Sequence, residues 1–129
     1  QFIGAVNLHD EQLPLYRAQE AEMVLLSWSP DYPDPDGNAT PMSNFDAKSL
    51  AWRNMWQNDT ASKLAADASL ESDSAKRVEM YAQLTELVAK EGPFAILYQP
   101  FRPIVTQASL KGFVRNAQGN TDFDKISKE

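Results

Sequence analysis

The chain has 129 residues, of which 43% are hydrophobic, so its size and composition suit one domain or part of a larger protein. Its net charge is −6, with 18 acidic and 12 basic residues, which argues against binding to nucleic acid or to anionic membrane surfaces. The absence of cysteine excludes disulfides and cysteine-based zinc sites, and no apolar run approaches the roughly 20 residues of a membrane span.

The first third of the sequence predicts two strands, one short helix and a long loop. Residues 2–8 are predicted as a strand, followed by a helix from Pro14 to Gln19 in which Pro14 suits the first position. The apolar run within Glu22 to Trp28 predicts a buried strand, and residues 29–46, rich in Pro, Asp, Gly and Asn, predict a loop. Because the sequence shows neither an initiator methionine nor a secretory signal, we expect its start to lie inside a longer protein.

The middle of the sequence has helical periodicity. Residues 47–58 carry Trp52 and Trp56, which would share one face of a helix because they are four positions apart. Another helix is predicted over about residues 61–70, with Asp59 or Thr60 as its cap.

The strongest helical pattern opens at Asp73 or Ser74 and is ended by Gly92 and Pro93. Its apolar stripe consists of Val78, Tyr81, Leu84, Leu87 and Val88.

The last third contains three further strand candidates. These are Phe94 to Tyr98, Ile104 to Thr106 and Lys111 to Val114, with prolines between the first two that indicate an edge or crossing segment. Residues 115–129 are polar and weakly patterned. Strands mixed with helices predict an α/β or α+β fold.

The loop that follows Trp28 contains the sharpest candidate for a binding site. Its prolines restrict the backbone, so Asp31 can be held in place before a ligand arrives. A carboxylate between Trp28 and Tyr32 suits an ammonium group, since charge-assisted hydrogen bonds contribute about 1.5–3 kcal/mol and an aromatic face adds roughly 0.5–2 kcal/mol. The alternatives are that Asp31 only starts a turn and that Trp28 belongs to the core.

Metal, cofactor and catalytic signatures are not convincing in this sequence. The segment from Asp34 to Asn38 invites comparison with a calcium loop, but Tyr32 and Ser43 would then stand where acidic ligands are required. His9 is the only histidine, which is too few for a two-imidazole metal site. We therefore expect no catalytic residue, no metal site and no cofactor.

Four segments together resemble a known family. Met23 to Pro35 is similar to the W-x-x-D-Y-x-D-P segment of bacterial extracellular peptide-binding proteins, the peptide/nickel-type solute-binding components of ABC importers. Arg77 to Leu84 resembles the R-x-x-x-Y-x-x-L helix of that family, and Gly92 to Tyr98 its next strand. Val105 to Phe113, which ends in Leu110-Lys111-Gly112-Phe113, resembles its closing v-x-G-f stretch. The order and spacing agree over about residues 20–125.

The resemblance implies an α/β clamshell of the type II periplasmic-binding-protein kind. This chain would be a C-terminal lobe fragment with a mixed sheet flanked by helices. Residues 1–107 would belong to the ligand-binding lobe, and residues 108–129 would be a tail that returns to the N-terminal lobe. In the family the acid of the motif pairs with the α-ammonium of a bound peptide, and the tryptophan three residues earlier lines the cavity. We therefore expect Asp31, Trp28 and Tyr32 to bind the ligand.

The implied function is transport and not catalysis. A peptide or other small amine-bearing solute would be captured by lobe closure and delivered to a membrane ABC permease. Relatives of this shape also carry nickel chelates, haem, opines or oligosaccharides. The full-length protein would be a monomer, either periplasmic or lipid-anchored outside a Gram-positive cell.

Two other functions compete with this interpretation. One is a hydrolase that uses Asp31 with Asp34 or Asp36 as a carboxylate pair. The other is a protein–protein interaction module with an exposed face formed by Trp52 and Trp56.

Overall fold

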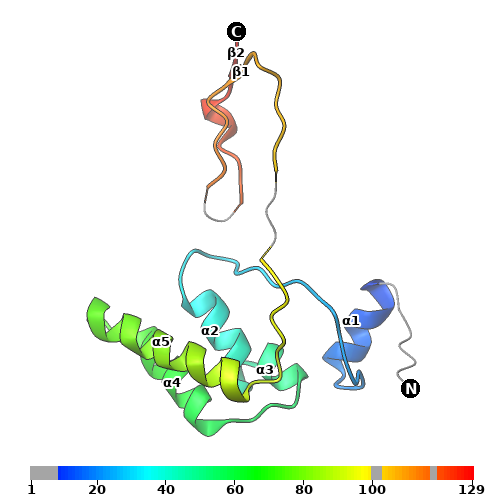
Figure 1. Ribbon diagram of the computed structural model, residues 1–129, viewed down its shortest axis with the longest axis vertical. Coiled ribbons are helices and arrows are strands. Elements are labelled where there is room, and N and C mark those ends of the chain that lie inside the picture. Colours follow the sequence, from blue (N-terminus) through cyan, green and yellow to red (C-terminus); the bar gives the residue numbers. More distant parts are fainter. Residues whose placement is uncertain (1–8, 100–102, 117–118) are drawn as a thin grey trace.

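The computed structural model describes residues 9–99, 103–116 and 119–129, and the strand predicted at residues 2–8 lies outside them. The α-helices gather in residues 9–99, and residues 103–116 and 119–129 project away from them (Figure 1). The elements in chain order are α1 (His9–Arg17), α2 (Asp36–Ser43), η1 (Phe45–Ala47), α3 (Leu50–Arg53), α4 (Asp59–Leu70), α5 (Ser74–Glu91), β1 (Leu110–Lys111), η2 (Phe123–Lys125) and β2 (Ser127–Lys128).

The core of the helical part lies between α4 and α5. Three alanines of α4 fall on one face at spacings of four and three residues, and all are fully buried: Ala61, Ala65 and Ala68. Their small side chains let α5 approach closely, and Tyr81 and Leu84 of α5 fill the interface. Leu87 and Val88 pack at the edge of this interface, as the apolar stripe predicted, but Val78 is 69% exposed and does not belong to the core.

The caps of these two helices follow their sequences closely. The Asp73 carboxylate accepts hydrogen bonds from the amides of Ala75 and Lys76, and the amide of Gly92 closes the other end of α5. The predicted limits of α5 are therefore confirmed. In α4 the cap is Asn58, whose Oδ1 accepts from the amide of Ala61, so the predicted caps Asp59 and Thr60 were wrong by one or two residues.

A helix interrupts the loop predicted at residues 29–46. The sequence of α2 contains Gly37, Asn38 and Pro41, which have low intrinsic helix propensity. It is helical because it packs on α4 and α5, with Gly37 and Ser43 buried. Tertiary burial therefore overrides the local preference, and only residues 29–35 form the loop.

The helix predicted over residues 47–58 is reduced to the short α3, preceded by the last residue of η1. Lys48 and Met55 both adopt a left-handed conformation with φ of 53°. After α3, the amide of Met55 bonds to Trp52 and that of Trp56 bonds to Ala51, which is the pattern of a Schellman end. Glycine normally occupies the left-handed position, so Met55 gave no warning of this stop. Trp52 and Trp56 therefore do not share a helix face.

The first helix packs beside α3 and begins earlier than predicted. It starts at His9 and ends at Arg17, so Pro14 lies inside it and not at its first position. Tyr16 is buried, and its hydroxyl accepts a hydrogen bond of 2.6 Å from Nδ2 of Asn54.

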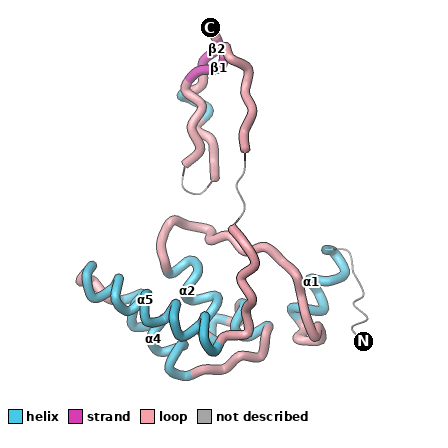
Figure 2. Tube along the Cα trace, in the orientation of Figure 1, coloured by secondary structure: helices cyan, strands magenta, loops and turns pink. Residues whose placement is uncertain are grey.

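Three predicted strands are extended but belong to no sheet. Residues 22–28, 94–98 and 104–106 form no backbone hydrogen bond with any described residue. Figure 2 shows them as loop, and most of their large apolar side chains are exposed, for example Leu25 (74%) and Ile96 (77%). The buried strand predicted at Glu22 to Trp28 was therefore wrong, because a strand needs a neighbour that satisfies its backbone groups.

The sheet in the described region is small and antiparallel. β1 pairs with β2 in a register that places Leu110 opposite Lys128. Gly112 follows β1 with φ of 72°, and a Cβ there would lie 1.9 Å from the carbonyl oxygen of Lys125, so glycine is required. The strand predicted at Lys111 to Val114 is thus confirmed only at Lys111. Overall the described fold is helix-rich, and the mixed sheet flanked by helices is not seen in it.

Candidate functional site

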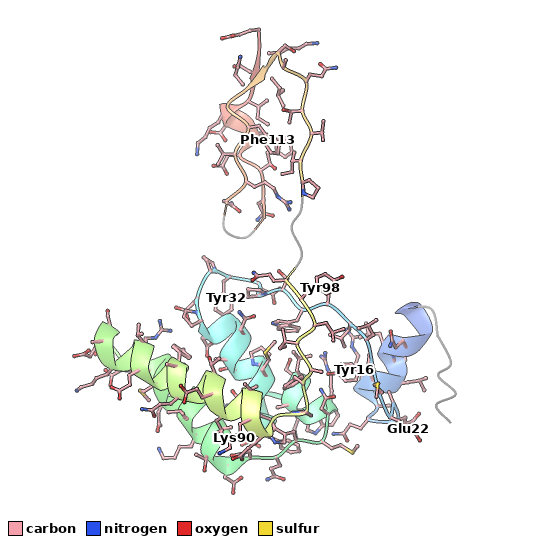
Figure 3. The ribbon with its side chains drawn as sticks, in the orientation of Figure 1. Tyr16, Glu22, Tyr32, Lys90, Tyr98 and Phe113 are labelled. Carbon is pink, nitrogen blue, oxygen red and sulfur yellow. The ribbon has the colours of Figure 1, made fainter. Side chains whose placement is uncertain are left out.

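The three residues predicted to bind ligand lie on the loop before α2. Trp28 is half-buried, and its indole Nε1 donates a 3.1 Å hydrogen bond to Oδ1 of Asn38 on α2. Tyr32, at the upper edge of the helical part in Figure 3, is 46% exposed. Asp31 is exposed, and its carboxylate forms no hydrogen bond or ion pair with the described parts of the chain. The structure therefore places the three residues on one loop and leaves the Asp31 carboxylate available for a hydrogen bond or ion pair.

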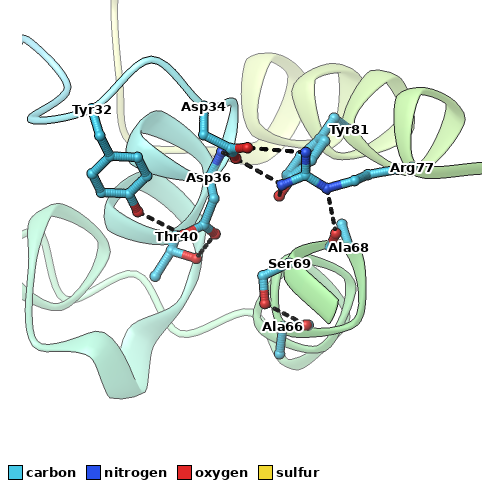
Figure 4. A network of polar contacts seen from close by, with 9 residues as sticks. All are labelled: Tyr32, Asp34, Asp36, Thr40, Ala66, Ala68, Ser69, Arg77 and Tyr81. Atoms are coloured by element: carbon cyan, nitrogen blue, oxygen red, sulfur yellow. Dashed lines mark hydrogen bonds and ion pairs between the residues drawn. The ribbon is translucent and has the colours of Figure 1, made fainter. Parts of the chain in front are cut away.

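A second carboxylate of this loop, that of Asp34, is fully engaged. The guanidinium of Arg77, in the first turn of α5, donates two parallel hydrogen bonds to it (Figure 4). Nη1 lies 3.0 Å from Oδ2, and Nη2 lies 2.7 Å from Oδ1. Such bidentate pairing adds geometric specificity to the charge attraction. Asp34 Oδ1 also accepts from the amide of Asp36, which starts α2.

Arg77 is itself held by two further contacts. Its Nε donates to the carbonyl of Ala68 at 3.1 Å, one of the carbonyls in the last turn of α4 that has no partner within the helix. Its Nη2 lies 3.2 Å from the hydroxyl oxygen of Tyr81, and the guanidinium carbon stacks 5.0 Å from the centre of that ring. One side chain therefore connects α4, α5 and the loop.

The electrostatics of the loop follow from these contacts. The hydrogen bonds from Arg77, and then the one from the Asp36 amide, lower the pKa of Asp34 below its usual value. The hydrogen bond that the Tyr32 hydroxyl donates to Asp36 Oδ2, at 2.8 Å, raises the pKa of Tyr32 because deprotonation would place two negative charges together. Thr40 donates a 2.5 Å bond to the other oxygen of Asp36.

The loop is also packed tightly against the first turn of α2. A Cβ added to Gly37 would lie 2.9 Å from Cβ of Pro30 and 3.2 Å from the carbonyl oxygen of Tyr32. Glycine at this position therefore allows the loop to fold back onto the helix that follows it.

A surface cavity lies elsewhere in the helical part. A depression of about 310 Å³ opens between η1 and α4. Its lining residues are Asn44, Phe45, Asp46, Gln57, Asp59, Ser62, Lys63 and Ala66. None of the three predicted ligand-binding residues lines it.

Within the described ranges, no group of three or more His, Asp or Glu side chains is arranged to hold a metal ion, and no helix has the length and apolarity to cross a membrane.

Neither competing function is favoured by the geometry. A hydrolase would need two carboxylates free to reach a substrate, but both oxygens of Asp34 accept hydrogen bonds from Arg77, and those of Asp36 accept from Tyr32 and Thr40. An interaction face would need exposed tryptophans, but Trp52 is half-buried with Lys48 over its ring, and Trp56 packs against the α4–α5 core.

The Asp34–Arg77 pair was not predicted from the sequence. Both residues stand inside segments that carry the family resemblance, one in the loop motif and one at the start of the R-x-x-x-Y-x-x-L helix. One signal could have indicated the pair: the loop motif contains an acid, and the helix motif contains an arginine, for which no other role was predicted. Because the two residues are 43 positions apart, their contact can be identified only from the packing of the helices.

Comparison with known proteins confirms the resemblance. No protein-family model matches the chain. A probable D,D-dipeptide-binding periplasmic protein of Escherichia coli strain K12 is 27% identical over 74% of the chain and 19% of its own length. Di/tripeptide-binding proteins 4 and 1 of Pseudomonas aeruginosa strain UCBPP-PA14 are 29% and 27% identical, over 91% and 83% of the chain. The chain is thus related in sequence to periplasmic peptide-binding proteins, and it spans about a fifth of the length of these relatives.

Proposed function

We propose, from its similarity to periplasmic peptide-binding proteins, that this chain is part of the C-terminal lobe of a type II clamshell solute-binding protein. The protein captures peptides, or a related amine-bearing solute, and delivers them to the permease of an ABC importer. The observation that carries the proposal is that five relatives, matched over 74–91% of the chain, are all named for binding dipeptides or tripeptides. Its place of action is the periplasm, or the outer surface of a Gram-positive cell through a lipid anchor.

The binding chemistry is centred on Asp31. Its carboxylate is exposed and has no partner among residues 9–99, 103–116 and 119–129, so it is free to accept hydrogen bonds from an α-ammonium group. Trp28 and Tyr32 stand on the same loop and present aromatic surface to the cation. The opposite wall of the cleft comes from the other lobe, and closure of the two lobes removes water from this contact. No covalent step is needed, and the relatives are named as binding proteins.

The domain boundary belongs to the same proposal. Residues 1–107 form part of the ligand-binding lobe, and residues 108–129 return to the N-terminal lobe. The projection of residues 103–116 and 119–129 away from the helices supports a separate C-terminal tail (Figure 1).

Calorimetry on the full-length protein with di- to pentapeptides tests the role of Asp31. We expect Asp31→Asn to weaken binding of free-amine peptides by about tenfold to a hundredfold, the equivalent of losing one charge-assisted hydrogen bond. Asp46→Asn, at an exposed carboxylate of η1 outside the loop, is the control and should leave affinity unchanged. If N-acetylated peptides bind as well as free-amine peptides, or if Asp31→Asn has no effect, the proposed function is wrong.

A further inference from the structure

The loop that carries Asp31 is fixed on both sides of that residue. On one side, the indole of Trp28 is bonded to Asn38, and Pro30 packs against Gly37. On the other side, the Asp34 carboxylate is gripped by Arg77. The segment from residue 28 to residue 38 is therefore closed on itself and also anchored to α5.

The anchor at Arg77 is the part of this arrangement that reaches beyond the loop. The planar guanidinium matches the two carboxylate oxygens, and its remaining Nε is used by the Ala68 carbonyl. Because the same Asp34 carboxylate accepts the amide of Asp36, the pair fixes both the end of the loop and the start of α2. A lysine at position 77 could supply the positive charge but not the two parallel hydrogen bonds to the Asp34 carboxylate.

We propose that Arg77 is a positioning residue for ligand binding, which presents Asp31 to the ligand ammonium by holding Asp34. This inference rests on the proposed function, because it takes Asp31 as the ammonium acceptor. The physical reason is preorganisation. A loop that is ordered before binding loses less conformational entropy when the ligand arrives, and its carboxylate meets the cation in the productive orientation.

The variants Arg77→Met and Asp34→Asn test this role in the full-length protein. Asn at position 34 keeps an oxygen that can accept from the Asp36 amide but loses the charge. Asp34→Asn is therefore the milder change, and it tests the same contact if Arg77→Met does not fold. Arg53→Met is a matched control: Arg53 also lies over a tyrosine ring, 5.8 Å from the centre of Tyr16, but forms no ion pair with any described residue.

The measurement is calorimetric affinity for one tripeptide with a free amine and for its N-acetylated form, on variants shown to be folded by thermal unfolding. We expect Arg77→Met and Asp34→Asn each to weaken binding of the free-amine peptide by about threefold to tenfold and the acetylated one by less than about twofold. The double variant should be no weaker than the worse single variant, because both changes break one contact. Arg53→Met should match the wild type.

The outcomes separate the two proposals. If Asp31→Asn removes the preference for the free amine but Arg77→Met and Asp34→Asn do not, the positioning role is wrong and the proposed function stands. If both peptides weaken equally in folded Arg77→Met, Arg77 has only a structural role. If the wild type shows no preference for the free amine, the proposed function itself fails.

Discussion

At the scale of single residues, the loop before α2 divides its acids between different tasks. Asp34 is bound by Arg77 and fixes the loop, and Asp36 accepts from Tyr32 and Thr40. Asp31 is left without a partner in the part of the chain that the structure describes. Composition alone makes these acids equivalent, so only their neighbours in space distinguish the anchored ones from the one proposed to bind ligand.

Gly37 gives a prediction at this scale. In an ordinary helix, replacing glycine by alanine stabilises a protein by about 1 kcal/mol. Here the new Cβ would lie 2.9 Å from Pro30 and 3.2 Å from the carbonyl of Tyr32. We therefore expect Gly37→Ala to lower the free energy of unfolding by about 1–3 kcal/mol, measured by urea denaturation. A gain in stability would show that the loop does not pack on α2 as described.

At the scale of elements, helices are stable here where a small-residue face meets a large one. The alanines of α4 lie against Tyr81 and Leu84 of α5, and both helices carry side-chain caps. The stripe of α5 was predicted from periodicity, but Val78 lies outside the contact, although Arg77 beside it reaches the carbonyl of Ala68 on α4. Periodicity therefore identifies the face, and the packing of the neighbouring helix decides which residues of that face are buried.

The contrast between Leu84 and Val78 is directly measurable. Leu84 is 2% exposed, so Leu84→Ala should lower the free energy of unfolding by about 2–5 kcal/mol through lost contacts and a residual cavity. Val78→Ala on the same helix should stay within about 0.5 kcal/mol of the wild type, because that side chain is 69% exposed. Urea denaturation of both variants is the measurement, and equal effects would contradict the packing of α5 on α4.

At the scale of the whole molecule, apolar extended segments remain on the surface of the helical part. Residues 22–28 and 94–98 were predicted as strands, and their sequences have the required apolar and β-branched character. They are unpaired within the described residues, and Met23 and Tyr98 are 71% and 76% exposed. We infer that their side chains are covered by other parts of the proposed full-length protein.

Amide hydrogen exchange tests this view of the two segments. In the present chain we expect the amides of residues 22–28 and 94–98 to exchange quickly, since no described group accepts a hydrogen bond from them. Amides in the middle of α5 should exchange much more slowly. In the proposed full-length protein, the two segments should become protected. Protection equal to that of α5 in the present chain would instead show that they already pair with each other or with the remaining residues.

The sequence by itself determined the helices α4 and α5, the cap at Asp73, the stop at Gly92 and the family resemblance, because these depend on local spacing and on short motifs. Only the tertiary structure decided that α2 is helical, that Met55 ends α3, and that Arg77 holds Asp34. For α2 and for the Arg77–Asp34 pair, the physical reason is that burial and charge pairing join residues far apart in the chain and can outweigh a local preference of about 1 kcal/mol per residue. The end of α3 rests instead on the left-handed conformation of Met55 and the hydrogen bonds around it, which the residue type does not indicate.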